Sequence, residues 1–184
     1  PTGWFFAPDP ATSRHACVGG CIGNNAAGSR SVRYGRTSEN LHGIDVCLAD
    51  GARVRFAQGA GRTDARARAL AMGVAEIVQR HAALIRERFP KTVRRNAGYG
   101  LDMILAELDA GVAPEDLDLT PLLCGSEGTL AYTLGAELKL HRLPAARGLA
   151  VVAFESVEDA IDAVPAILTT GPSAVELLDD MVIG

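Results

Sequence analysis

The stretch GIDVCLADGARVRF, residues 43–56, decides the fold. Its two halves, Gly43–Ala49 and Arg53–Phe56, alternate apolar and polar residues in the manner of half-buried strands. Between them, Asp50-Gly51 is a dipeptide that favours a two-residue hairpin turn. The sequence therefore predicts two antiparallel strands joined by a tight turn.

A long amphipathic helix is predicted directly after this hairpin. Asp64 to Phe89 carries a face at spacings of three and four residues, and Pro90 closes the pattern. That face consists of Leu70, Val74, Ile77, His81, Leu84 and Arg88. We interpret His81 on this face as a satisfied core or boundary histidine rather than as a ligand.

The second half of the chain alternates helix and strand. A shorter helix is expected at Leu101–Ala110, and a strand interrupted by Gly135 is expected at Thr129–Leu140. A smaller unit follows, with an apolar strand at Leu149–Phe154, a helix from about Ser156 to Leu168 and a strand at Ala174–Val182.

These elements predict an α+β fold class with a mainly antiparallel sheet flanked by helices. The stretch LPAARG, residues 143–148, contains the turn formers proline and glycine and is interpreted as a linker. It divides the chain into a first domain at 1–142 and the start of a second domain at 149–184.

Length and charge limit the classes of function. With 184 residues and 48% hydrophobic composition, the chain can bury one full core. Its 18 basic and 22 acidic residues give a net charge of −4, so we expect no nucleic-acid partner. The sequence lacks both an apolar run long enough to span a membrane and a signal-peptide core at its start. We therefore expect a cytoplasmic location.

The cysteines and histidines do not form a metal-binding pattern. Cys17, Cys21, Cys47 and Cys124 are too few and too scattered for a disulfide framework. Cys17 and Cys21 lack the second pair or histidine cluster of a zinc site. The four histidines, His15, His42, His81 and His141, also lack ligand spacing. We expect reduced thiols and no metal.

Two glycine-rich clusters are the candidate functional segments. The first, CVGGCIGNNAAGSRSVRYGRTSEN at residues 17–40, offers close backbone approach and amide side chains to an anion such as a pyrophosphate. The second, GSEGT at residues 125–129, precedes a predicted strand. Neither cluster is a Rossmann fingerprint or a P-loop. Either they share a ligand and lie close together, or they are ordinary turns that bind nothing.

Six motifs in the same order resemble the FAD-linked oxidases of the vanillyl-alcohol oxidase superfamily. Within this family, which has a PCMH-type FAD-binding domain, the resemblance is to the enzymes that act on D-2-hydroxy acids. The motifs are FFAPDP (5–10), GG followed by NNAAG (19–28), RYGRT (33–37), LADG (48–51), NAGYGLD (96–102) and GSEGTL (125–130).

The resemblance implies FAD as the cofactor and assigns its contacts. The implied cofactor-binding residues are Pro8, Gly19, Gly20, Gly23, Asn24, Asn25, Gly28, Tyr34, Gly35, Thr37, Gly125, Ser126 and Gly128. On local grounds, Tyr34 is equally a core aromatic residue and Thr37 a turn hydroxyl. Arg30, Arg33 and Arg36 either meet phosphate or form a solvated basic rim, and we favour the rim.

The resemblance also implies the reaction. Enzymes of the D-lactate, glycolate and D-2-hydroxyglutarate type oxidise a small D-2-hydroxy acid by hydride transfer to FAD and pass the electrons to an acceptor. No catalytic residue is assigned, because Glu127, an acid beside glycines, is read as a capping or salt-bridging group. The alternative is a stand-alone structural or interaction module that keeps only the fold.

Two departures from the family pattern shape these expectations. The sequence has neither the upstream RGGGTS-type segment nor the metal-ligating histidines and glutamate of the family's cap domain. We therefore interpret the chain as the second part of a PCMH-type domain plus an incomplete βαβ start of the cap. As such it is expected to bind FAD weakly or not at all by itself, and to self-associate through exposed apolar surface. We expect the longer protein to be cytoplasmic, with a peripheral position at a membrane as the alternative.

Overall fold

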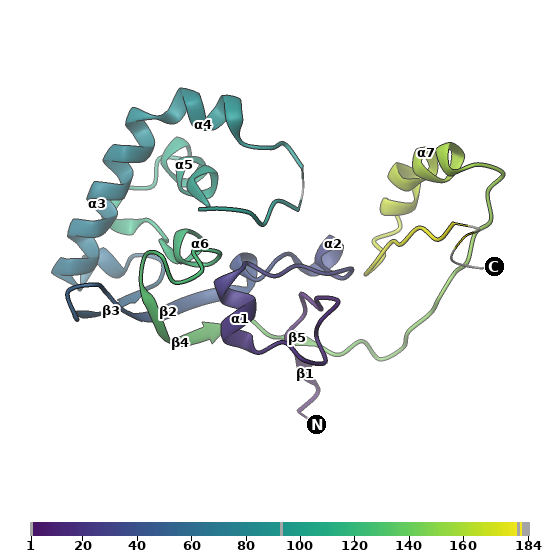
Figure 1. Ribbon diagram of the computed structural model, residues 1–184, viewed down its shortest axis with the longest axis horizontal. Helices are drawn as coiled ribbons and strands as arrows, with labels where there is room; N and C mark the ends of the chain where they lie inside the picture. Colours follow the sequence, from purple (N-terminus) through teal and green to yellow (C-terminus); the bar gives the residue numbers. More distant parts are fainter. Residues whose placement is uncertain (1, 93, 180, 182–184) are drawn as a thin grey trace.

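The computed structural model describes residues 2–92, 94–179 and 181. Strands β2 (Leu41–Cys47), β3 (Arg53–Phe56) and β4 (Tyr132–Leu138) form an antiparallel sheet in the order β3-β2-β4. Strands β1 (Trp4–Phe5) and β5 (His141–Arg142) form a separate antiparallel pair. Helices flank the sheet (Figure 1), and the α+β class with antiparallel strands is confirmed.

The hairpin at the start of the sheet has a longer turn than the sequence suggested. Val46 lies opposite Val54, and the Leu48 amide donates to the Ala52 carbonyl at 2.9 Å. The loop between Leu48 and Ala52 is therefore three residues long, and its last residue, Gly51, has a φ of +82°. The prediction of a two-residue turn is wrong, because a type I turn followed by a left-handed glycine needs one residue more.

Strand β4 is irregular where the sequence predicted an interruption. Asp45 pairs with Gly135 and Val46 pairs with Thr133, so the register shifts between these two pairs. The extra residue on β4, Leu134, is left between them as a bulge. The sheet thus bends next to the glycine that marked the interruption.

The long helix predicted at 64–89 is broken in two. Helix α3 (Ala65–Arg80) begins after Asp64, whose carboxylate accepts hydrogen bonds from two amides of the first turn. His81 leaves helical geometry, with φ −105° and ψ 14°, and α4 (Ala82–Arg88) follows. Ile85 of α4 is buried in the core, so packing overrides the continuous local pattern.

The buried face of α3 differs from the predicted face. Ala67, Ala71, Ala75 and Val78 are buried, whereas Ile77 is 53% exposed, and His81 and Leu84 are exposed as well. Helix α3 contacts β3 and α5 (Leu101–Asp109). The alanine face is buried because small side chains let the helix axis lie close to its neighbours. Of the two alternatives for His81, the core position is wrong, because the residue is exposed where α3 ends and α4 begins.

The remaining helices of the first unit are short. The helix predicted at 101–110 is confirmed as α5, which buries Ile104 and Leu105. The others are α1 (Val18–Gly23), α2 (Ser31–Tyr34) and α6 (Thr120–Leu123), with single 3₁₀ turns η1 (Ser38–Asn40), η2 (Ala60–Arg62) and η3 (Pro114–Asp116). Helix α1 lies within the first glycine-rich cluster, and α6 leads directly into the second. The two helices lie near each other beside β2 and β4 (Figure 1).

The C-terminal segment contains the predicted helix but not the predicted strands. Helix α7 (Val157–Leu168) follows Ser156, whose Oγ accepts a hydrogen bond from the Asp159 amide at 3.1 Å. Residues 149–154 and 174–179 form no strand. Residues 180 and 182 of the second predicted strand lie outside the described residues.

The reason for the missing strands lies in their surroundings. Leu149 is 91% exposed and Val151 is 88% exposed, so neither packs against a neighbouring layer. Two short strands are not stable without a third strand or a covering helix. In Figure 1, α7 lies apart from the three-stranded sheet, at the end of the long segment after β5.

Candidate functional site

The two glycine-rich clusters are joined by backbone hydrogen bonds. The Gly125 amide donates to the Ile22 carbonyl at 2.8 Å, and the Glu127 amide donates to the Gly23 carbonyl at 3.0 Å. The second loop is therefore fixed against the end of α1. The expectation that the two clusters lie close together in space is confirmed.

A hollow of about 440 Å³ opens where the clusters meet. This volume falls in the range of small-molecule sites. Three segments line it, with residues Asn24, Asn96, Ala97, Gly98, Tyr99, Gly125, Ser126, Glu127 and Thr129. The hollow includes Asn24, Gly125 and Ser126 from the residues that the resemblance implied.

The third segment of the lining, residues 96–99, was absent from the predicted site. It belongs to the motif NAGYGLD, and Gly98 in it has a φ of +74°. The Tyr99 hydroxyl lies 2.9 Å from Thr129 Oγ1, which connects this segment to the GSEGT loop. A glycine-containing motif in an irregular segment between two helices was the signal that could have identified it.

The direction of the hydrogen bonds at this connection follows from their chemistry. Thr129 Oγ1 lies 2.5 Å from the Ser126 carbonyl oxygen, which can only accept. The threonine hydroxyl therefore donates to Ser126 and accepts from the Tyr99 hydroxyl. This leaves the tyrosine oxygen with lone pairs that can accept a hydrogen bond from a ligand.

Three glycines of α1 face open space. A Cβ added at Gly19, Gly20 or Gly23 would meet no atom within 4 Å. Glycine inside a helix costs about 0.5–1 kcal/mol relative to alanine, and nothing in the chain itself requires glycine here. Gly20 accepts a hydrogen bond from the Asn24 amide at 3.1 Å, so it lies one turn from a residue of the hollow and on the same face.

Comparisons with known proteins give the clusters a family context. Residues 1–57 match the family of FAD binding domains, and residues 143–184 match the C-terminal domain of FAD linked oxidases. The chain resembles the FAD-linked oxidases along its whole length. The expectation of FAD as the cofactor is confirmed by the match to the FAD binding domain.

The relatives that match are longer proteins. The chain is 32% identical to the D-2-hydroxyglutarate dehydrogenase of Escherichia coli (strain K12), over 100% of the chain and 18% of that protein. It is 33% identical to a probable mitochondrial D-lactate dehydrogenase of Danio rerio, over 99% of the chain and 27% of that protein. The chain thus spans less than a third of the length of these relatives.

The open space at Gly19, Gly20 and Gly23 is compatible with a bulky ligand such as FAD, because no atom of the chain lies where a side chain would stand. Contact of FAD with these three glycines stays a prediction. The hollow next to them offers neutral donors and acceptors from Asn24 and Tyr99. Its lining includes the Glu127 carboxylate and, among the described residues, no lysine or arginine. The hollow therefore suits uncharged polar groups of FAD better than its pyrophosphate.

Four other glycines are required by the chain itself. A Cβ at Gly28 would lie 1.8 Å from the Asp9 carbonyl oxygen, so only glycine fits there. Gly35, Gly125 and Gly128 have positive φ values of +79°, +90° and +78°. These positions are explained by backbone geometry, and their contacts with FAD stay predictions.

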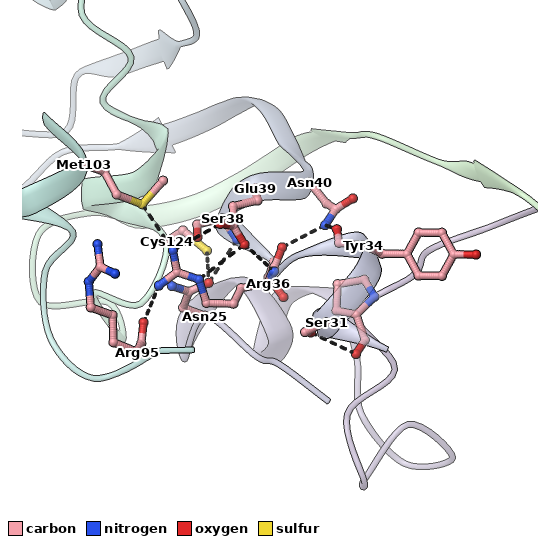
Figure 2. A network of polar contacts seen from close by, with 12 residues as sticks. Asn25, Ser31, Tyr34, Arg36, Ser38, Glu39, Asn40, Arg95, Met103 and Cys124 are labelled. Carbon is pink, nitrogen blue, oxygen red and sulfur yellow. Dashed lines mark hydrogen bonds and ion pairs between the residues drawn. The ribbon is translucent and has the colours of Figure 1, made fainter. Parts of the chain in front are cut away.

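Pro8, Thr37 and Tyr34 also have partners within the chain. The buried Pro8 offers its carbonyl to Ser31 Oγ at 3.4 Å, and Thr37 Oγ1 donates to the Ala26 carbonyl at 2.8 Å. The Tyr34 ring packs edge-on against Phe5, with centroids 5.5 Å apart. Figure 2 shows Tyr34 on the opposite side of the network from Arg95. Direct flavin contact by these three residues stays a prediction.

Asn25 connects the clusters through its side chain. Its Oδ1 accepts from the Ser38 amide at 2.9 Å and from the thiol of Cys124 at 3.7 Å. Burial raises the pKa of the Cys124 thiol to about 12, and burial together with the nearby Cys17 raises that of Cys21. Both thiols are protonated at neutral pH, which excludes them as nucleophiles.

The three arginines of the first cluster have separate roles. Arg30 pairs with Asp9 at 3.0 Å, and Arg33 donates to the Gly171 carbonyl at 3.0 Å. Arg36 is only 5% exposed, so the interpretation of a solvated basic rim is wrong for this residue. It is buried because its guanidinium has partners inside the protein.

Glu127 does not behave as the capping or salt-bridging group that we expected. Among the described residues its carboxylate forms neither an ion pair nor a hydrogen bond. Glu127 lies at the hollow, and its φ is +51°.

No group of three or more metal-ligating side chains occurs in the described part of the chain. Within the same residues, no helix is long and apolar enough to cross a membrane.

Proposed function

We propose that the two glycine-rich clusters and residues 96–99 form one wall of the FAD site of an oxidoreductase that acts on a D-2-hydroxy acid. The observation that carries this proposal is the junction of the clusters. Gly125 and Glu127 donate backbone hydrogen bonds to the end of α1, beside glycines with open space above them. The backbone bonds hold the junction together by themselves, but a shared ligand also explains the open glycines beside it, which ordinary turns do not require.

The proposed wall would hold FAD in place by close backbone contact and by hydrogen bonds. When bound, FAD supplies the two-electron redox chemistry. Gly19 and Gly20 let the cofactor approach the backbone of α1, and Asn24, Ser126 and Tyr99 offer it uncharged polar groups. We assign no catalytic base, since the one carboxylate among the described residues at the hollow, that of Glu127, has no hydrogen bond or ion pair there that would orient it.

The substrate class rests on the relatives. Their names specify D-2-hydroxyglutarate and D-lactate, which share a D-2-hydroxy acid group. Oxidation of such a group removes a proton from the hydroxyl and a hydride from the α-carbon, and yields a 2-oxo acid. We propose this reaction for the full-length gene product in the cytoplasm, with an electron acceptor completing the cycle.

The experiment that tests this proposal uses the full-length gene product. We expect the purified protein to carry flavin absorbance, and D-2-hydroxyglutarate or D-lactate to bleach it under anaerobic conditions. The L-enantiomers serve as matched controls and should leave the spectrum unchanged. A colourless protein that fails to take up added FAD, or bleaching by both enantiomers alike, would contradict the proposal.

A further inference from the structure

The guanidinium of Arg36 lies in the protein interior, between the first glycine cluster and the segment before α5. Its Nη1 donates to the Arg95 carbonyl, and its Nη2 lies 3.7 Å from the thioether sulfur of Met103. The Glu39 carboxylate binds the same guanidinium at 3.3 Å. Figure 2 shows Arg36 with the Arg95 carbonyl, Met103 and Glu39 around it.

The Arg95 carbonyl belongs to the residue just before the lining segment 96–99. Arg95 also pairs with Asp102 of α5, and Arg94 Nη1 donates to the Gly28 carbonyl at 2.9 Å. Two arginines therefore tie this irregular segment to the first glycine cluster: Arg36 belongs to the cluster and Arg94 to the segment. Of the two, only Arg36 is buried; Arg94 is exposed.

The lining segment has little regular structure of its own. Residues 94–100 form neither helix nor strand, and Ala97, Gly98 and Tyr99 are exposed. Such a segment opens easily unless a buried contact restrains it. The side-chain contact at its far end, between Tyr99 and Thr129, is solvent-exposed.

We propose that Arg36 is a positioning residue, which holds residues 96–99 against the GSEGT loop and so keeps the hollow in shape. Its bidentate geometry suits this role. The planar guanidinium reaches Glu39, the Arg95 carbonyl and Met103 at once, and a lysine ammonium in the same place reaches fewer partners. The Glu39 carboxylate orients the guanidinium and neutralises its charge. The same carboxylate accepts a hydrogen bond from the Arg36 backbone amide at 2.6 Å.

The test is limited trypsin cleavage after Arg94 and Arg95 in the full-length gene product carrying Arg36→Lys, because cleavage requires this segment to leave its place. We expect cleavage there to become about 10- to 100-fold faster, which is the effect of losing one hydrogen bond to a charged group. Cleavage within β3 and α3 should stay unchanged. A merely structural role would instead accelerate cleavage throughout the core, so uniform acceleration would overturn the proposal, as would unchanged cleavage after Arg94 and Arg95.

Two further variants complete the experiment. Arg55→Lys is the matched control, because Arg55 also pairs with two carboxylates, Asp45 and Glu137, but on the exposed surface of the sheet. It should leave cleavage after Arg94 and Arg95 unaffected. If Arg36→Lys fails to fold, Glu39→Gln releases the guanidinium from its ion pair and should accelerate cleavage after Arg94 and Arg95 to a smaller degree; no change there would overturn the proposal.

FAD titration gives a second measurement that rests on the proposed function. We expect Arg36→Lys to weaken FAD binding by about tenfold, the effect of roughly one lost hydrogen bond. Unchanged FAD affinity together with faster cleavage after Arg94 and Arg95 would overturn the proposed link between Arg36 and the hollow. If the wild-type protein takes up no FAD, the proposed function fails, and the cleavage data alone decide the role of Arg36.

Discussion

The Gly125 amide donates a hydrogen bond of 2.8 Å to the carbonyl of Ile22, a residue that is 2% exposed. Gly125 has a φ of +90°, and a Cβ there would lie 3.1 Å from the Cβ of Asn25. The two glycine-rich clusters are thus joined through backbone atoms in the interior. Substitution of an exposed side chain at the hollow should change ligand contacts without separating the clusters.

Gly28 and Gly19 illustrate two kinds of glycine: the fold requires Gly28, whereas Gly19 faces the proposed ligand. Gly28→Ala would place a Cβ 1.8 Å from the Asp9 carbonyl oxygen. We expect it to lower the free energy of unfolding by about 3 kcal/mol, at the upper end of overpacking costs. Gly19→Ala meets no atom within 4 Å and should raise it by about 0.5–1 kcal/mol. Urea denaturation of both variants checks the difference, and equal stabilities would show that the chain does not require glycine at position 28.

Asn40 connects β5 to the first glycine cluster. Its Nδ2 donates to the Tyr34 and Arg36 carbonyls, each at 2.8 Å, and its Oδ1 lies 2.7 Å from His141 Nε2. We expect Asn40→Ala to lower the free energy of unfolding by about 1–3 kcal/mol for each buried group left without a partner. Asn24 is exposed, so Asn24→Ala should change the free energy of unfolding by less than about 0.5 kcal/mol. Chemical denaturation measures both, and a stability loss no larger for Asn40→Ala than for Asn24→Ala would contradict this.

His141 makes stability depend on pH. Asn40 uses both Nδ2 protons on carbonyls, so its Oδ1 accepts from His141 Nε2–H. Burial, and secondarily Lys139, lower the pKa of His141 in the folded state. The unfolded chain therefore binds this proton more tightly, and the contribution to stability is complete above pH about 6.5 and declines as the pH falls below it.

The matched variant for this pH effect is His141→Gln. Glutamine offers an amide donor toward Asn40 but does not titrate. We expect the free energy of unfolding of the wild type to fall more steeply than that of the variant between pH 7 and pH 5, as measured by urea denaturation at each pH. Parallel profiles would show that His141 does not contribute.

The sequence predicted the local elements well and their packing less well. The alternation of Arg53–Phe56 gave β3 with the correct bounds, and Ser156 marked the start of α7. The break at His81 and the buried alanine face of α3 were missed. The break and the alanine face both depend on how closely α3 and α4 approach the sheet and α5. The spacing of apolar residues along a helix carries no information about that distance.

The site was predicted in the same uneven manner. Glycine content identified both clusters that meet at Gly125 and Ile22. It did not separate Gly20, which faces open space, from Gly28, which the chain needs for its own packing. It also missed the segment at Tyr99 and the burial of Arg36, because these depend on contacts between residues far apart in the sequence.

The most direct test of the central claim compares Gly20→Val with Gly73→Val in the full-length gene product. Both glycines lie inside helices, and a Cβ at either position meets no atom within 4 Å, but only Gly20 belongs to the proposed FAD wall. Valine costs no more than glycine in a helix, so both variants should stay folded. Gly128→Val is unsuitable because φ is +78° there.

The measurement is the dissociation constant of FAD, obtained by fluorescence quenching, with circular dichroism as the check on folding. The account predicts that Gly20→Val binds FAD at least about 100-fold more weakly, a loss of about 2.7 kcal/mol, while Gly73→Val keeps the wild-type affinity. Wild-type affinity in a folded Gly20→Val protein, or equal losses in both variants, would contradict the claim that α1 forms part of the FAD site.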